Sequence, residues 1–144
     1  MAIKDMLVLL DNGYATPEKP AASRGTGNPD VDVLGPGPTL AIDLARRLEA
    51  HVTGVALAVD PIVPGFVVAP LPVEVIEQAR AQAVQVAGTA SERFVALAGR
   101  AGVSAETRVA EILMGGAPEG FVVNCRATDL VVIGQDDPDR PEPM

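Results

Sequence analysis

Short, continuous apolar runs alternate along the chain with longer segments whose apolar residues recur every three or four positions. A continuous run is typical of a strand buried on both faces, whereas the three-to-four spacing is typical of an amphipathic helix. The runs lie at 6–10, 52–59, 103–110 and 129–134, and the third is the most polar. We therefore expect four strands, with the third nearer an edge of the sheet.

The helical spacing predicts three helices, one in each interval between the strands. The first covers 40–48, and the second begins at Val73 and stops near the glycines at 99 and 102. The third is short, because Pro118 suits the first turn of a helix and the next strand follows soon after it. The residues assigned to the buried faces are Leu40, Ala41, Leu44, Ala45 and Leu48, then Val73, Ile76, Ala79, Ala83, Val86, Ala90, Phe94 and Leu97, then Phe121, Val122 and Cys125.

The alternation of strands and helices fixes the expected fold class. Helical connections of this length are what parallel neighbouring strands require, so the order predicts an α/β fold with a parallel sheet. Gly88 lies inside the second helix, where glycine costs roughly 1 kcal/mol relative to alanine. We interpret Gly88 as a point of close packing.

Two segments have no counterpart in a minimal α/β unit of this kind. The first is a Gly- and Pro-rich insertion at 15–36, far longer than the ~2–6 residues usual between a strand and a helix. It is interpreted as a disordered insertion, with an added edge strand near 30–34 or a lid over the site as alternatives. The second segment, 135–144, is an acidic, Pro-rich tail or linker. The expected organisation is thus one domain at 1–134 followed by this tail.

Composition narrows the range of functions. The chain has 144 residues, with 11 Lys and Arg against 19 Asp and Glu, and a formal net charge of −8. This charge argues against a nucleic-acid partner. One Cys and one His allow neither an internal disulfide nor a zinc site, so no metal is expected. The amino-terminal sequence does not resemble a signal peptide and no apolar run is long enough to span a membrane, which predicts a soluble, cytoplasmic protein without a membrane partner.

The candidate ligand-binding residues are those that follow the strands, because ligands of open parallel sheets bind at the carboxyl ends of the strands. The residues there are Asp11, Asp60, Glu111 to Gly116, and Gly134 to Asp137. Asp11 could accept hydrogen bonds from a ribose or an adenine amine, or could simply turn the chain. Gly115 and Gly116 could lead into an anion-binding helix terminus, or could form an ordinary turn.

Catalytic signals are weak. The chain contains no P-loop motif, and Gly35-Pro36-Gly37 fits the dinucleotide-binding pattern poorly. His51 is expected at the amino end of the sheet, where a helix-terminal cap is its predicted role. Cys125 falls on an apolar helical stripe and is interpreted as a small buried residue rather than a reactive thiol. No catalytic residue is assigned, and we expect the protein not to be an enzyme.

Four stretches together resemble the universal stress protein family. They are the first strand ending in Asp11, the helix TLAIDLARRLEAHVTG leading into VALAVDP, the long helix EQARAQAVQVAGTASERFVALAGRAGVSAETRV, and the phrase ATDLVVIG. The resemblance covers nearly the whole chain apart from the insertion and the tail. It implies a three-layer sandwich of the adenine-nucleotide α-hydrolase-like type, often dimeric, in which some members bind ATP.

The resemblance also implies a binding site. Its adenosine contacts correspond to Asp11 and Val59, and its phosphate loop, G-x-x-G, nine residues, then G-S/T, begins at Gly134. Here Asp137 replaces the second glycine, and two adjacent carboxylates, Asp136 and Asp137, would repel phosphate. The sequence also reaches Met144 without the final Gly-Ser/Thr or a fifth strand.

The expected function is therefore a non-catalytic domain in stress response or regulation. It would act through association, as a homo-oligomer or beside a second similar domain, and no cofactor is required. The alternative is an ATP-binding switch with a noncanonical phosphate site, in which Mg²⁺ could bridge phosphates and carboxylates. A nucleotide-dependent transferase or hydrolase is the third hypothesis.

Overall fold

A four-stranded parallel sheet forms the middle layer of the molecule. The computed structural model describes residues 2–10, 34–59, 72–112 and 117–134, and all that follows concerns these residues. The strands are β1 (Asp5–Leu10), β2 (His51–Val59), β3 (Ala105–Ile112) and β4 (Leu130–Val132). Their order in the sheet is β3-β2-β1-β4, and every neighbouring pair is parallel. The predicted α/β fold is confirmed, as is the placement of the polar third strand at an edge.

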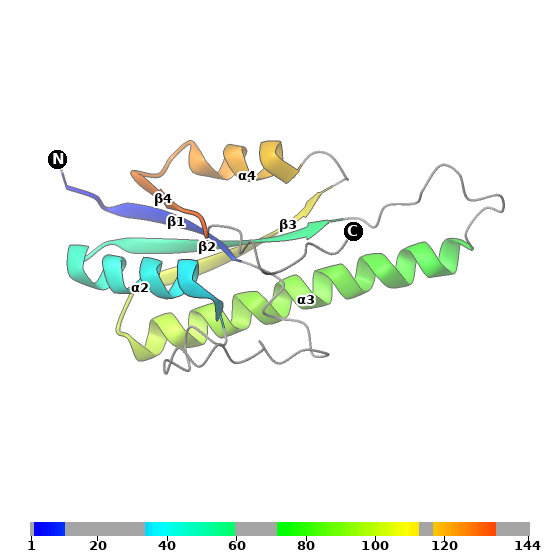
Figure 1. Cartoon of the computed structure of the whole chain (residues 1–144), viewed down its shortest axis with the longest axis horizontal. Coiled ribbons are helices and arrows are strands. Elements are labelled where there is room, and N and C mark those ends of the chain that lie inside the picture. The colour runs from blue at the N-terminus through cyan, green and yellow to red at the C-terminus, as the bar shows by residue number, and fades with distance from the viewer. Residues whose placement is uncertain (1, 11–33, 60–71, 113–116, 135–144) are drawn as a thin grey trace.

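Helices cover both faces of this sheet and complete a three-layer sandwich (Figure 1). α2 (Pro36–Leu48) and α3 (Val73–Arg100) pack on one face, and α4 (Ala117–Cys125) packs on the other. The first face carries the larger core, because two helices close over alternate residues of the strands. Phe94 of α3 is fully buried there, and a Cβ atom on Gly54 of β2 would lie only 2.8 Å from its ring.

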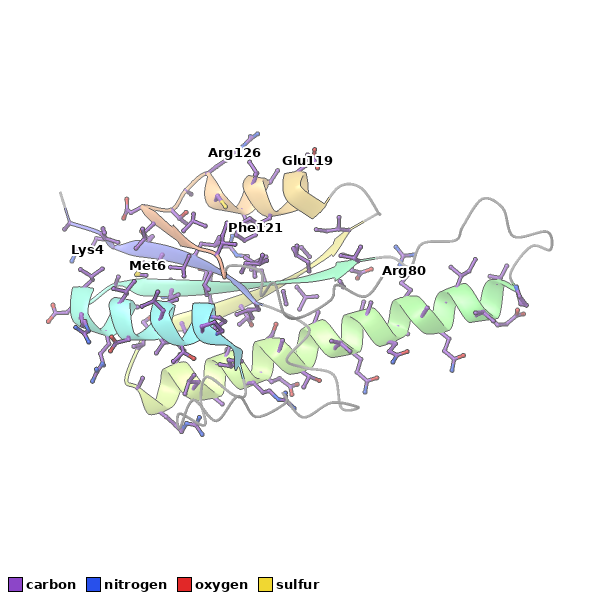
Figure 2. The ribbon with its side chains drawn as sticks, in the orientation of Figure 1. Lys4, Met6, Arg80, Glu119, Phe121 and Arg126 are labelled. Carbon is purple, nitrogen blue, oxygen red and sulfur yellow. The ribbon has the colours of Figure 1, made fainter. Side chains whose placement is uncertain are left out.

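The core on the α4 side is smaller. Leu7 of β1, Val55 of β2 and Phe121 of α4 form its buried centre, and Val131 of β4 packs against it. Figure 2 shows Phe121 between α4 and the sheet. A helix of 9 residues thus covers this face, so the strands keep more exposed side chains here than beneath α2 and α3.

Asp129 joins the two ends of the described chain. Its Oδ2 accepts hydrogen bonds from the backbone N–H groups of Lys4, at 2.8 Å, and Asp5, at 3.1 Å. These two donors hold the pKa of Asp129 below its ordinary value, because they stabilise the carboxylate form. The carboxylate therefore fixes the start of β1 beside the start of β4.

α2 differs from its prediction in length and in its buried face. It begins at Pro36 rather than Leu40, and it buries Ala41, Ile42 and Ala45. Leu40 is 53% exposed and Leu48 39% exposed, so their assignment to the buried face is wrong. Ala41, Ile42 and Ala45 face the core instead, and Leu40 lies on the exposed side of the helix.

α3 spans the predicted residues and extends beyond the ends of β2 and β3 (Figure 1). Its carboxyl-terminal half buries the predicted residues Ala90, Phe94 and Leu97, whereas Val73 is 64% exposed in the overhanging end. The interpretation of Gly88 is also wrong, because nothing lies within 4 Å of the place its Cβ would take. A glycine that does meet the core closely is Gly54 of β2.

β3 and α4 show smaller differences. β3 covers Ala105–Ile112, two residues later than predicted, because its pairing begins with Ala105 opposite Val52. In α4, Phe121 is buried as predicted, but Val122 is 56% exposed and points away from the inner face. The predicted insertion lies outside the described residues up to position 33.

Candidate functional site

The strand order puts the position at which open α/β sheets form their ligand-binding crevice between β1 and β4, at the carboxyl edge of the sheet. From β1 the chain winds through α2 to β2 and through α3 to β3, and then returns through α4 to the other side of β1. The connecting helices change face at this return, so the winding direction reverses between β1 and β4. A reversal of this kind is where ligands of open α/β sheets bind.

Two of the three predicted site residues lie at this edge within the described chain. Val59 is the last residue of β2 and is 39% exposed. Gly134 follows β4 and, because Val132 pairs with Val8, lies near the level of Leu10. The third residue, Asp11, comes directly after Leu10 and lies outside the described residues, as do Asp60 and the stretches 113–116 and 135–144.

The structure adds a contact that sequence reasoning missed. A Cβ atom on Gly37 would lie 3.2 Å from the backbone nitrogen of Gly134, so the start of α2 packs directly on the loop after β4. A side chain on Gly37 would push these two backbones apart. The signal in the sequence was Gly35-Pro36-Gly37, which we weighed only as a dinucleotide motif.

The start of α2 is poorly suited to hold an anion. Pro36 and Pro38 occupy its first turn and have no N–H group, so two of the donors that a helix terminus normally offers are missing. Gly37 is buried between them. Thr39 Oγ1 donates a 2.9 Å hydrogen bond to the Gly35 carbonyl and so closes the turn internally. This terminus can position Gly134 but offers little to a phosphate.

A second residue that the sequence reasoning missed is Arg80 of α3. Its Nε lies 3.7 Å from Oε2 of Glu111, which is near the end of β3, so the arginine is on the carboxyl-edge side of the sheet. Both side chains are about half exposed. The ion pair partly neutralises Arg80, and Arg80 makes a further interaction besides this pair. The ion pair is visible only in the structure, where α3 packs beside β3, because the two residues are far apart in sequence.

His51 lies at the amino end of β2, as predicted, but it does not cap a helix. Its Nδ1 lies 2.9 Å from Ser104 Oγ, within hydrogen-bond distance. The cap assignment is wrong because the pairing of Val52 with Ala105 brings Ser104, which directly precedes β3, beside His51. The pair therefore lies at the edge of the sheet opposite the crevice.

Cys125 has the environment of a packing residue. It is partly buried against Phe121, and its Sγ donates a hydrogen bond of 3.4 Å to the Phe121 carbonyl. Burial raises the pKa of the thiol, so at neutral pH it remains protonated and is a weak nucleophile. This agrees with its interpretation as a small, inert residue.

No group of three or more His, Cys, Asp or Glu side chains is arranged to hold a metal ion in the described ranges. Within the same part of the chain, no helix is both long enough and apolar enough to cross a membrane.

Known structures share this fold. The universal stress protein UspA from Lactobacillus plantarum superposes with a TM-score of 0.65 at 15% identity, over 100% of this chain and 85% of that one. A protein from the universal stress protein family of Burkholderia pseudomallei gives a TM-score of 0.56 at 20% identity, over 92% of this chain and 82% of that one. Neither a family model nor a curated protein matches the sequence.

Proposed function

On the premise that this chain has the universal stress protein fold, we propose that it is a non-catalytic regulatory domain of stress response that acts by associating with a second copy of itself. The observation that carries the proposal is the open edge of β4. This strand pairs with β1 on one side and with no other strand in the described part of the sheet. Unpaired backbone groups on an edge strand readily bind another strand.

The surroundings of β4 also favour association. Ile133, directly after the strand, is 60% exposed, and Val122 and Val123 of α4 are 56% and 59% exposed. α4 and β4 contribute to the same small core, so these apolar side chains belong to one side of the molecule. Burying them between two copies would remove apolar surface from water, at about 25 cal/mol for each Å². The carboxyl edge, in contrast, offers no pair of nucleophile and base among the described residues, which supports a non-catalytic role.

Replacing Ile133 with lysine is expected to separate the associated copies. The side chain is already exposed, so the fold should tolerate the change, whereas association would place a charge in an apolar contact. Light scattering at ~100 µM should show a dimer or larger assembly for the unaltered protein and a dissociation constant at least ~10-fold weaker for the variant, worth about 1.4 kcal/mol.

The matched control is Val95→Lys, because Val95 is 44% exposed on α3, which packs over β2 and β3 rather than beside β4. This variant should associate like the unaltered protein. If the unaltered protein were a stable monomer at the same concentration, association would be refuted. If both variants associated equally weakly, β4 would not be part of the contact.

The alternative function is an ATP-binding switch, which the crevice between β1 and β4 favours by its position. We expect weak binding, because the start of α2 lacks two N–H donors and Arg80 is already paired with Glu111. Calorimetric titration with ATP and Mg²⁺ should give a dissociation constant weaker than ~10 µM, about −7 kcal/mol. Tighter binding that Asp11→Ala weakens would establish the switch in place of our proposal.

A further inference from the structure

An open pocket lies at the amino edge of the sheet, opposite the crevice. Its volume is about 480 Å³, and the starts of β1 and β2, the end of α2 and the connection from α3 to β3 surround it. Pockets for small ligands usually measure ~300–1,000 Å³. The polar side chains that line it are Lys4, Arg46, Glu49, His51 and Ser104. Figure 2 shows Lys4 at this amino edge of the sheet and Arg80, on α3, toward the carboxyl edge.

The backbone of Glu49 is strained in this pocket. Its φ of 52° and ψ of 41° are left-handed, and it is the one non-glycine residue with positive φ in the described chain. Glycine or asparagine usually occupies this position after a helix, because a larger residue brings its Cβ close to a carbonyl oxygen. Strained residues of this kind gather at ligand-binding sites.

Charge makes glutamate still less suitable at this position. The carbonyl end of a helix carries partial negative charge, so a carboxylate beside the end of α2 is repelled. The nearby Arg46 and Arg47 bind Asp43 instead, at 2.9 and 2.8 Å. Glu49 itself forms no ion pair within the described residues. The left-handed backbone lets the Glu49 N–H group cap the Ala45 carbonyl at the end of α2, but glycine would do the same with less strain and no repelled charge. The Glu49 carboxylate therefore has no partner in the described part of the fold that accounts for it, as is often the case for functional residues.

The residues at the starts of β1 and β2 give the pocket positive charge and a hydrogen-bonding ring. Lys4 is exposed, and its ammonium group forms no ion pair in the described part of the chain. The Nδ1 atom of His51 faces Ser104 Oγ, which holds the ring at the pocket. A simple anion would meet the Glu49 carboxylate, and a simple cation would meet Lys4. A ligand that carries both charges satisfies both sides.

We infer that this pocket binds a small zwitterion of the amino-acid class. The ammonium group of the ligand lies at the Glu49 carboxylate and the carbonyl end of α2, and its carboxylate lies at Lys4 and His51. The apolar lining consists of Ala45, Ala50 and Val103, which are small residues and leave room for a side chain. None of the residues that line the pocket belongs to β4, and the inference does not depend on association.

The test is an NMR titration of the ¹⁵N-labelled protein with each of the protein amino acids in turn, at millimolar concentration. At least one should shift the amide signals of residues 49–51 and 102–104 in a saturable way. If none does, or if the shifts are confined to the carboxyl edge, the inference is overturned.

Glu49→Gly separates a ligand role from a structural one. Glycine removes both the strain and the repelled charge, so the variant should unfold at a higher temperature yet bind the same amino acid at least ~10-fold more weakly. Glu49→Gln should also weaken binding, whereas Glu92→Gln, on the exposed surface of α3, should leave it unchanged. Unchanged affinity or a lower unfolding temperature for Glu49→Gly would contradict the inference.

Discussion

Replacing Phe94 with alanine is expected to lower the free energy of unfolding by about 3–5 kcal/mol. Phe94 is 0% exposed and is among the largest fully buried side chains, in the core that joins α3 to β1 and β2. Its removal leaves a cavity that the strands of a paired sheet cannot easily close. Since domains are stable by only ~5–15 kcal/mol, urea unfolding followed by circular dichroism should show a large shift of the midpoint.

The neighbouring Val95 provides the matched control. It lies on the same helix but is 44% exposed, so Val95→Ala should change the free energy of unfolding by no more than ~0.5 kcal/mol. If Phe94→Ala and Val95→Ala had the same free energy of unfolding, the packing of Phe94 would not be what holds α3 on the sheet.

Adding one methyl group at Gly54 is expected to destabilise the protein by about 1–3 kcal/mol. The new Cβ would lie 2.8 Å from the Phe94 ring and 3.1 Å from a methyl group of Leu10, and both of these side chains are buried in the core. Alanine is otherwise favoured over glycine within a strand by roughly 0.5–1 kcal/mol, so the packing clash must outweigh this preference. Urea unfolding of Gly54→Ala measures the net effect.

Two further variants identify the cause. Gly88 has open space around it, so Gly88→Ala should stabilise the protein by up to ~1 kcal/mol, as alanine does in a helix. When Phe94 is already alanine, Gly54→Ala should become neutral or stabilising, because the cavity accepts the methyl group. A cost that persisted in the double variant would show that the backbone of β2, and not the Phe94 ring, excludes a side chain at this position.

The sequence predicted the secondary structure well because each element leaves its own local pattern. Strands buried on both faces appear as continuous apolar runs, and the exposed Glu106 and Arg108 distinguished β3 as an edge strand. Interactions across the sheet leave no such pattern. Gly54 and Gly88 look alike in the sequence, yet only Gly54 faces an aromatic ring, and that difference depends on the distance between α3 and β2.

The candidate site was predicted only in outline for the same reason. The strand ends placed Val59 and Gly134 at the carboxyl edge, because parallel strands bring their ends to one side. The packing of Gly37 on Gly134 and the ion pair of Arg80 with Glu111 join residues from separate elements. No periodicity can show such contacts. The roles assigned to Asp11, Val59 and Gly134 in nucleotide binding remain predictions.

The central position of β1 determines when the sheet can be completed during synthesis. β1 is made first, and β2 and β3 can join it in the order in which they leave the ribosome. The second edge of β1 stays unpaired until β4 is made. Asp129, which directly precedes β4, then binds the backbone of Lys4, 125 residues away in the sequence. Until then a fully formed apolar strand has one unpaired edge, which is a template for pairing with another nascent chain. The growing polypeptide therefore passes through a stage in which β1 is a sheet edge, and the pairing of β4 with β1 ends that exposure.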